Sequence, residues 1–105
     1  MKKDKNIVNS LGYCFVSNLI IQQKQEIGYM YKEFPDDDDD SGWRFFSGNE
    51  TEDYMNNPDN FAIYSVESII SIDERITQFI NSDFGSEFIL QNGISVELKG
   101  GPEIP

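Results

Sequence analysis

The side chains that could perform chemistry in this sequence are almost all carboxylates. The chain has 105 residues, with 19 Asp and Glu, 8 Lys and Arg, one cysteine and no histidine. The lack of histidine removes the commonest general base and the commonest metal ligand. The sequence also has no Gly-x-Ser-x-Gly elbow and no glycine-rich phosphate-binding loop. Because neighbouring carboxylates carry little information in so acidic a chain, we predict a protein that is not an enzyme and needs no cofactor.

The densest group of carboxylates is one uninterrupted run. It consists of Asp36, Asp37, Asp38, Asp39 and Asp40, followed by Ser41 and Gly42. Counted from Asp37, the run matches the first six positions of an EF-hand calcium loop. Position twelve of that loop needs a bidentate Glu, but Gly48 stands there, and the flanking segments have the pattern of strands. We therefore predict a solvated loop with weak, exchangeable cation association and no specific metal ligands.

The net charge of −11 is concentrated in the middle of the chain. Residues 1–32 sum to +3, residues 33–59 to −9 and residues 60–105 to −5. A segment this acidic repels phosphate backbones, so we expect no nucleic-acid partner, even though strand aromatics such as Tyr29 and Tyr31 could stack on bases. The same segment would attract a basic protein surface and speed its encounter.

The size and composition indicate one globular domain. A hydrophobic fraction of 38% and an aromatic fraction of 13% supply enough large side chains for a single core. We predict one domain over residues 1–105, with an ordered core at about residues 10–99 and loose termini. Cys14 lies in an apolar run and has no partner for an intrachain disulfide. With no signal-peptide pattern and no apolar run of membrane-spanning length, we expect a cytoplasmic protein without a membrane partner.

The first half of the chain has the pattern of strands. Residues 12–21 are apolar at both odd and even positions, which predicts a central strand covered on both faces. Residues 26–34 predict a second strand, paired with the first as a hairpin, with Ile27, Tyr29 and Tyr31 on one face. Residues 36–42 are the predicted acidic loop, and residues 43–46 a third strand.

The second half predicts short helices between strands. Asn49 or Thr51 is placed to cap a short helix, and residues 61–64 have the pattern of a short strand. Ser65 is placed to cap a further helix, with a break near Asp73 before a second apolar set at helical spacing.

An Asn-Gly pair at residues 92–93 is the strongest hairpin signal in the chain. A two-residue turn there predicts that Ile89 lies opposite Val96. Together the elements predict an α+β fold, with a mainly antiparallel twisted sheet of about five or six strands and two or three short helices packed on it.

Three stretches of the sequence resemble a known family. They are residues 28–35, residues 40–50 with their Ser-Gly-Trp-Arg-Phe core, and Tyr54 together with the Asn-Pro-Asp-Asn of residues 57–60. Over about residues 12–88, the chain resembles a bacterial family first catalogued as a domain of unknown function and later described as an immunity-protein domain of polymorphic toxin systems. The resemblance implies a cytoplasmic antitoxin that binds and blocks a cognate toxin, and it implies no defined catalytic residues.

The acidic run and its neighbours are the predicted partner-binding residues. The set consists of Asp36, Asp37, Asp38, Asp39, Asp40, Trp43, Arg44, Glu50 and Tyr54. The run would steer a cognate toxin or another basic protein, and Trp43, Arg44 and Tyr54 would anchor it. Arg44 is equally placed for an ion pair with a neighbouring carboxylate. A small-ligand or divalent-cation module is the alternative function, a carboxylate-only enzyme is the third, and the oligomeric state stays open.

Overall fold

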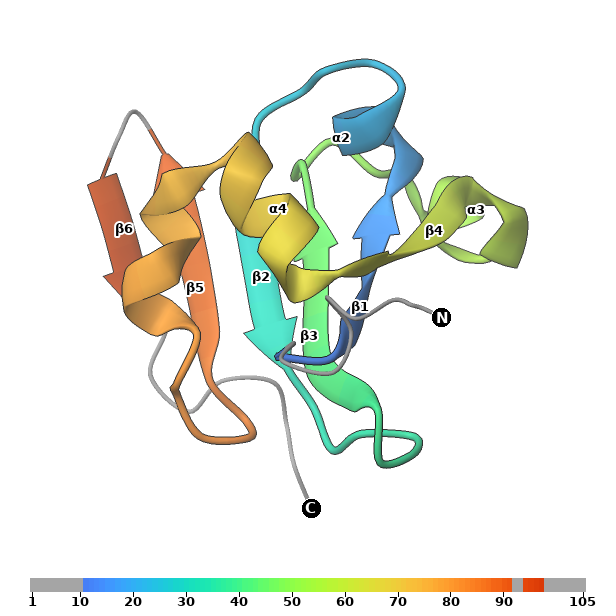
Figure 1. Ribbon diagram of the computed structural model, residues 1–105. Coiled ribbons are helices and arrows are strands. Elements are labelled where there is room, and N and C mark those ends of the chain that lie inside the picture. Colours follow the sequence, from blue (N-terminus) through green and yellow to red (C-terminus); the bar gives the residue numbers. More distant parts are fainter. Residues whose placement is uncertain (1–10, 92–93, 98–105) are drawn as a thin grey trace.

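The centre of the fold is a six-stranded sheet with strand order β4-β1-β3-β2-β5-β6 (Figure 1). The structure is a computed structural model that describes residues 11–91 and 94–97. The strands are β1 (Tyr13–Ser17), β2 (Tyr29–Lys32), β3 (Asp40–Phe46), β4 (Phe61–Ser65), β5 (Glu87–Gln91) and β6 (Ile94–Glu97). β1 and β3 run parallel, and the other neighbouring pairs are antiparallel. The α+β class and the mainly antiparallel sheet are therefore confirmed.

Short helices connect the strands, and two of them cover one face of the sheet. They are α2 (Asn18–Ile21), α3 (Glu52–Met55), the 3-10 helix η1 (Pro58–Asn60), α4 (Val66–Ile72) and the 3-10 helix η2 (Glu74–Phe79). α4 and η2 lie against the same face, in front of the sheet in Figure 1. Within the described ranges, no helix has the length and apolar character that crossing a membrane requires.

The core lies between the sheet and this helix layer. Successive strand residues point to opposite faces, so every second side chain of β1, β2, β3 and β5 faces α4 and η2. The buried strand residues on this side are Cys14, Val16, Met30, Trp43, Phe45, Phe88 and Leu90. They meet Val66, Ile69, Ile76 and Ile80 from the helix layer. Cys14, in the apolar run of β1, is fully buried.

Local capping signals define the helix starts. Thr51 Oγ1 accepts a hydrogen bond from the Tyr54 amide at 3.1 Å, which selects Thr51 over Asn49 as the cap of α3. Ser65 Oγ accepts from the Ser68 amide at 3.1 Å, as predicted. The predicted break is also confirmed, because α4 ends at Ile72 and Asp73 caps η2.

The predicted pairing of the first two strands is wrong. The apolar segment 12–21 is a strand only as far as Ser17, whose hydroxyl accepts from the Leu19 amide and starts the helical turn α2. This turn buries Ile20 in the core and takes the chain away from β1. As a result β2 is shorter than predicted and lies between β3 and β5, while β3 takes the place beside β1. β3 also begins earlier than predicted, at Asp40.

The C-terminal hairpin has the predicted register. β5 and β6 are antiparallel with Ile89 opposite Val96. The Asn-Gly turn at residues 92–93, the loose N-terminus and the loose C-terminal tail are predictions that lie outside the described residues.

Candidate partner-binding site

Arg44 is the centre of a polar network at the acidic loop, which in the structure comprises residues 33–39, between β2 and β3. Its Nη1 and Nη2 donate to the two carboxylate oxygens of Asp40 at 2.9 and 2.8 Å, and its Nε donates to Glu33 at 2.6 Å. Only 4% of Arg44 and 5% of Asp40 are exposed. The ion-pair role that the sequence allowed for Arg44 is therefore confirmed.

Both members of this buried pair stay charged. Burial alone would raise the pKa of Asp40, but hydrogen bonds from Arg44 and from the amides of Asp36 and Gly42 lower that pKa to about 2. Burial would likewise lower the pKa of Arg44, and the hydrogen bonds to Asp40 and Glu33 outweigh it and raise the pKa. The bidentate geometry fixes the position of the Asp40 carboxylate, and through it the end of the loop.

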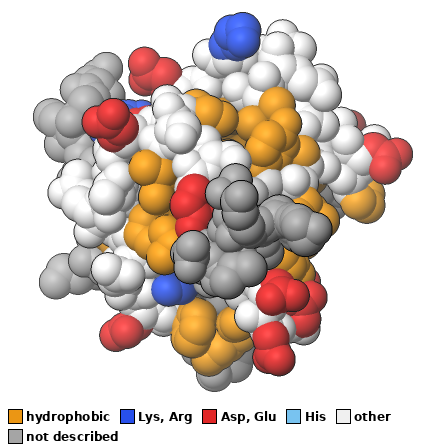
Figure 2. All heavy atoms as spheres, viewed as in Figure 1, with side chains coloured by type: hydrophobic (Ala, Val, Ile, Leu, Met, Phe, Trp, Pro, Cys, Tyr) orange, Lys and Arg blue, Asp and Glu red, His pale blue; other side chains and the backbone are white. Residues whose placement is uncertain are grey.

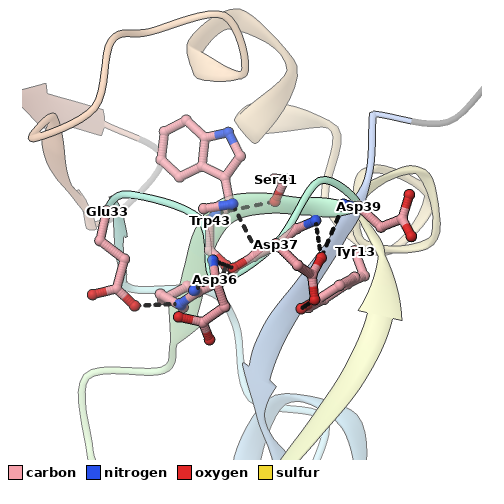
Figure 3. A network of polar contacts seen from close by, with 10 residues as sticks. Tyr13, Glu33, Asp36, Asp37, Asp39, Ser41 and Trp43 are labelled. Carbon is pink, nitrogen blue, oxygen red and sulfur yellow. Dashed lines mark hydrogen bonds and ion pairs between the residues drawn. The ribbon is translucent and has the colours of Figure 1, made fainter.

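Asp37 folds the acidic loop onto itself and onto β1. Its Oδ1 accepts from the amides of Asp39 and Asp40 at 2.9 and 3.1 Å, and its Oδ2 accepts from the Tyr13 hydroxyl at 2.9 Å (Figure 3). The hydrogen bond to Asp37 is the largest cause that raises the pKa of Tyr13 to about 12, so the phenol remains a donor at neutral pH. The loop is thus a folded turn tied to a strand.

The five aspartates have different roles. Asp40 is buried in the ion pair, and Asp37 bonds within the loop. Asp36, Asp37, Asp38 and Asp39 are exposed. Acidic side chains gather over this end of the molecule at the lower right of Figure 2. The run therefore contains one buried aspartate, one exposed aspartate that shapes the loop, and three further exposed aspartates.

The Ser-Gly-Trp-Arg-Phe segment builds the start of β3. Ser41 Oγ accepts from the Trp43 amide at 3.0 Å, and the Gly42 carbonyl accepts from the Glu33 amide at 2.9 Å. Gly42 has a φ of +90°, and a Cβ there would lie 2.3 Å from the Glu33 carbonyl oxygen. The Trp43 indole is 1% exposed and donates to the Ile80 carbonyl at 3.1 Å. Burial leaves Trp43 and Arg44 almost no surface to offer as anchors.

Glu50 and Tyr54 lie away from the acidic loop. The acidic loop precedes β3, whereas Glu50 and Tyr54 follow its other end. The two ends of this seven-residue strand are about 20 Å apart. Glu50 closes the turn after β3, with Oε2 accepting from the Ser47 amide at 2.8 Å. Burial would raise the pKa of Glu50, but hydrogen bonds from Ser17 and nearby amides lower it. Tyr54 donates to the Asn60 carbonyl at 3.2 Å.

Sequence reasoning missed the side chains on the open face, by which we mean the sheet face opposite α4 and η2. The strand register places one row of side chains across five strands there: Ile63, Phe15, Arg44, Tyr31 and Glu87. A second row holds Phe46, Tyr29 and Ile89, with the ring of Phe61 against Phe46. The alternating positions of Tyr29 and Tyr31 did indicate that both lie on one face of a strand. The row across five strands depends on the strand order, which could not be predicted from the sequence.

The described carboxylates are not arranged as a metal site. In residues 11–91 and 94–97, no three His, Cys, Asp or Glu side chains are grouped so that they could hold an ion. The acidic loop is flanked by β2 and β3, so it lacks the helices of an EF-hand.

Fold and geometry together define a small α+β domain that presents an acidic loop beside an aromatic sheet face. The sequence profile of the Immunity protein Imm33 domain matches residues 14–97, and the chain belongs to this family. Neither a curated protein nor a solved structure matches the chain.

Proposed function

We propose that this protein is a cytoplasmic immunity protein that neutralises a bacterial toxin by direct protein–protein binding, without catalysis of its own. The observation that carries the proposal is the outward position of Asp36, Asp38 and Asp39 in a chain of the Imm33 family. Asp37 and Asp40 hold the loop in shape, so these three charges are presented from a fixed turn.

The physical basis of the proposal is electrostatic complementarity. Toxins that act on nucleic acids need basic surfaces, because cationic side chains supply most of the affinity for phosphates. A fixed acidic loop can occupy such a surface in place of the phosphates and raise the rate of encounter. Two of the four Lys and Arg side chains in the described residues, Arg44 and Arg75, are paired with Asp40 and Asp73, so they add no unpaired positive charge to this field.

The test is binding to the product of the adjacent gene. A triple variant, Asp36→Asn with Asp38→Asn and Asp39→Asn, should weaken capture of that product by roughly tenfold at low salt. Raised salt should weaken the native complex and leave the triple variant less affected, because salt screens exposed charges.

A control triple variant removes the same formal charge from other exposed positions. It carries Glu26→Gln, Glu74→Gln and Asp83→Asn. This control should bind like the native protein. Absence of binding by the native protein at low salt, or equal effects of the two triple variants, would refute the proposal.

A further inference from the structure

The open face carries a nearly continuous aromatic surface. Ring centroids are 5.9 Å apart for Tyr54 and Phe61, 6.0 Å for Phe61 and Phe46, and 5.6 Å for Phe46 and Tyr31. Tyr29 joins the same group, 5.7 Å from Phe46. The aromatic residues therefore link α3 to β2 across the whole width of the central strands.

This surface is not shielded by the helix layer. α4 and η2 pack on the other side of the sheet, against the core. Ile63, at the β4 end of the first row, is 63% exposed, and Tyr29, Tyr31 and Phe61 are partly exposed, whereas Phe46 at the centre of the aromatic group is only 7% exposed. Exposed apolar side chains gathered on one face are typical of interaction sites.

The charge that β1 to β5 place on the open face is negative. Arg44 is the one Lys or Arg that β1 to β5 place there. Lys32 lies opposite Trp43 in the strand register, so its side chain is on the same side of the sheet as Trp43, facing the helices. Its positive charge is compensated by Asp40 and Glu33. Glu87 adds a further carboxylate, which accepts a hydrogen bond from the Tyr29 hydroxyl. A complementary partner surface must be cationic.

The protein's own Arg44 shows how an aromatic ring and carboxylates of this face can hold a guanidinium group. The Arg44 Cζ lies 4.4 Å from the centroid of the Phe15 ring, with carboxylates at the edge of the same guanidinium. Arginine suits such a site better than lysine, because its planar group stacks on a ring while its edge pairs with a carboxylate.

We propose, building on the proposed toxin-binding role, that the open face is the contact surface and that it takes an arginine-bearing segment of the protein partner. The partner's guanidinium groups stack on the exposed ring surfaces around Tyr31 and pair with Glu33 and Glu87. The acidic loop guides the approach, and the open face holds the complex.

Two substitutions on the open face and one matched control test the surface. Ile63→Ser and Tyr31→Ser should each weaken binding of the adjacent-gene product by about tenfold or more, mainly through faster dissociation. Ile72→Ser is the control, because Ile72 is also an exposed isoleucine, 53% exposed, but lies on α4. It should leave binding unchanged. Circular dichroism checks that each variant is folded, and Ile63 is exposed enough for its substitution to be tolerated.

Short peptides test the chemistry without the toxin. Peptides that alternate glycine with arginine or with lysine, and a single-stranded oligothymidine, are titrated into the labelled protein and followed by aromatic NMR signals. The arginine peptide should shift Tyr29 and Tyr31 and bind at least about threefold tighter than the lysine peptide, and the oligothymidine should not bind.

The outcomes separate this inference from the proposed function. If the acidic-loop triple variant weakens toxin binding while Ile63→Ser and Tyr31→Ser do not, the toxin-binding role stands and the open face is refuted as the contact surface. If the native protein does not bind the toxin, the proposed function fails. The peptide titrations would still show whether the open face prefers arginine to lysine. Equal binding of both peptides, oligothymidine binding, or dimerisation abolished by Ile63→Ser would each overturn the arginine-segment proposal.

Discussion

Replacing Asp40 by asparagine should destabilise the fold far more than replacing its neighbour Asp38. The Asp40 side chain is fully buried and accepts hydrogen bonds from Arg44 and from the amides of Asp36 and Gly42. Asparagine keeps one acceptor but removes the charge, so Arg44 is left buried with Glu33 as its counterion. Breaking a buried pair costs about 3–5 kcal/mol, and because Glu33 remains as a counterion we expect about 3 kcal/mol for this variant.

Asp38→Asn is the matched control because it changes the net charge equally at an exposed position. It should alter the free energy of unfolding by less than about 0.5 kcal/mol. Urea unfolding followed by the fluorescence of the single tryptophan measures both variants. Equal stability of the two variants would show that the Arg44–Asp40 pair does not hold the loop.

The same pair predicts a pH dependence with a defined sign. The folded-state pKa of Asp40 is about 2, below the value of about 3.9 expected for an unfolded chain. A lowered folded pKa stabilises the protein above the unfolded pKa, and the contribution of at most about 3 kcal/mol is lost as the pH falls from about 5 towards 2. The stability of Asp40→Asn should therefore fall less steeply over this range than that of Asp38→Asn.

Three further substitutions or modifications test the structure around the site. Gly42→Ala should lower the free energy of unfolding by about 2–4 kcal/mol, because the new Cβ would collide with the Glu33 carbonyl. Gly48→Ala is the control, since Gly48 also has a positive φ but lies in open space, and it should lower the free energy less. Equal losses in urea unfolding would argue against the collision. Cys14 should resist thiol reagents until the protein unfolds, since burial raises its pKa to about 12; rapid labelling of the native protein would contradict its burial. Trp43→Phe should lose about 1–2 kcal/mol of stability through its missing hydrogen bond, with partner affinity kept within about twofold; a selective loss of binding would restore Trp43 as an anchor.

Local signals in the sequence predicted local structure well. The Ser65 cap, the break at Asp73 and the Ile89–Val96 register each depend on residues close together in the chain, and each is confirmed. The parallel pairing of β1 with β3 depends on contacts between distant segments. It was hidden because the apolar residues of α2, such as Ile20, continue the pattern of a buried strand without interruption.

The candidate site was only partly visible for a similar reason. Five consecutive aspartates look alike in a sequence, whereas the fold buries Asp40 and bonds Asp37 within the loop. Glu33 was not singled out, although it completes the Arg44 network from the end of β2. The open face required the strand order, since its first row collects one residue from each of five strands.

The association rate with the adjacent-gene product, measured as a function of ionic strength, is the most direct test of the acidic loop as the guide to a toxin. The native protein should associate quickly at low salt and lose much of that rate as salt is raised. The triple variant at Asp36, Asp38 and Asp39 should associate about tenfold more slowly at low salt and show a flatter salt dependence, with little change in dissociation. Identical rates and salt slopes for the native protein and the triple variant would contradict the account.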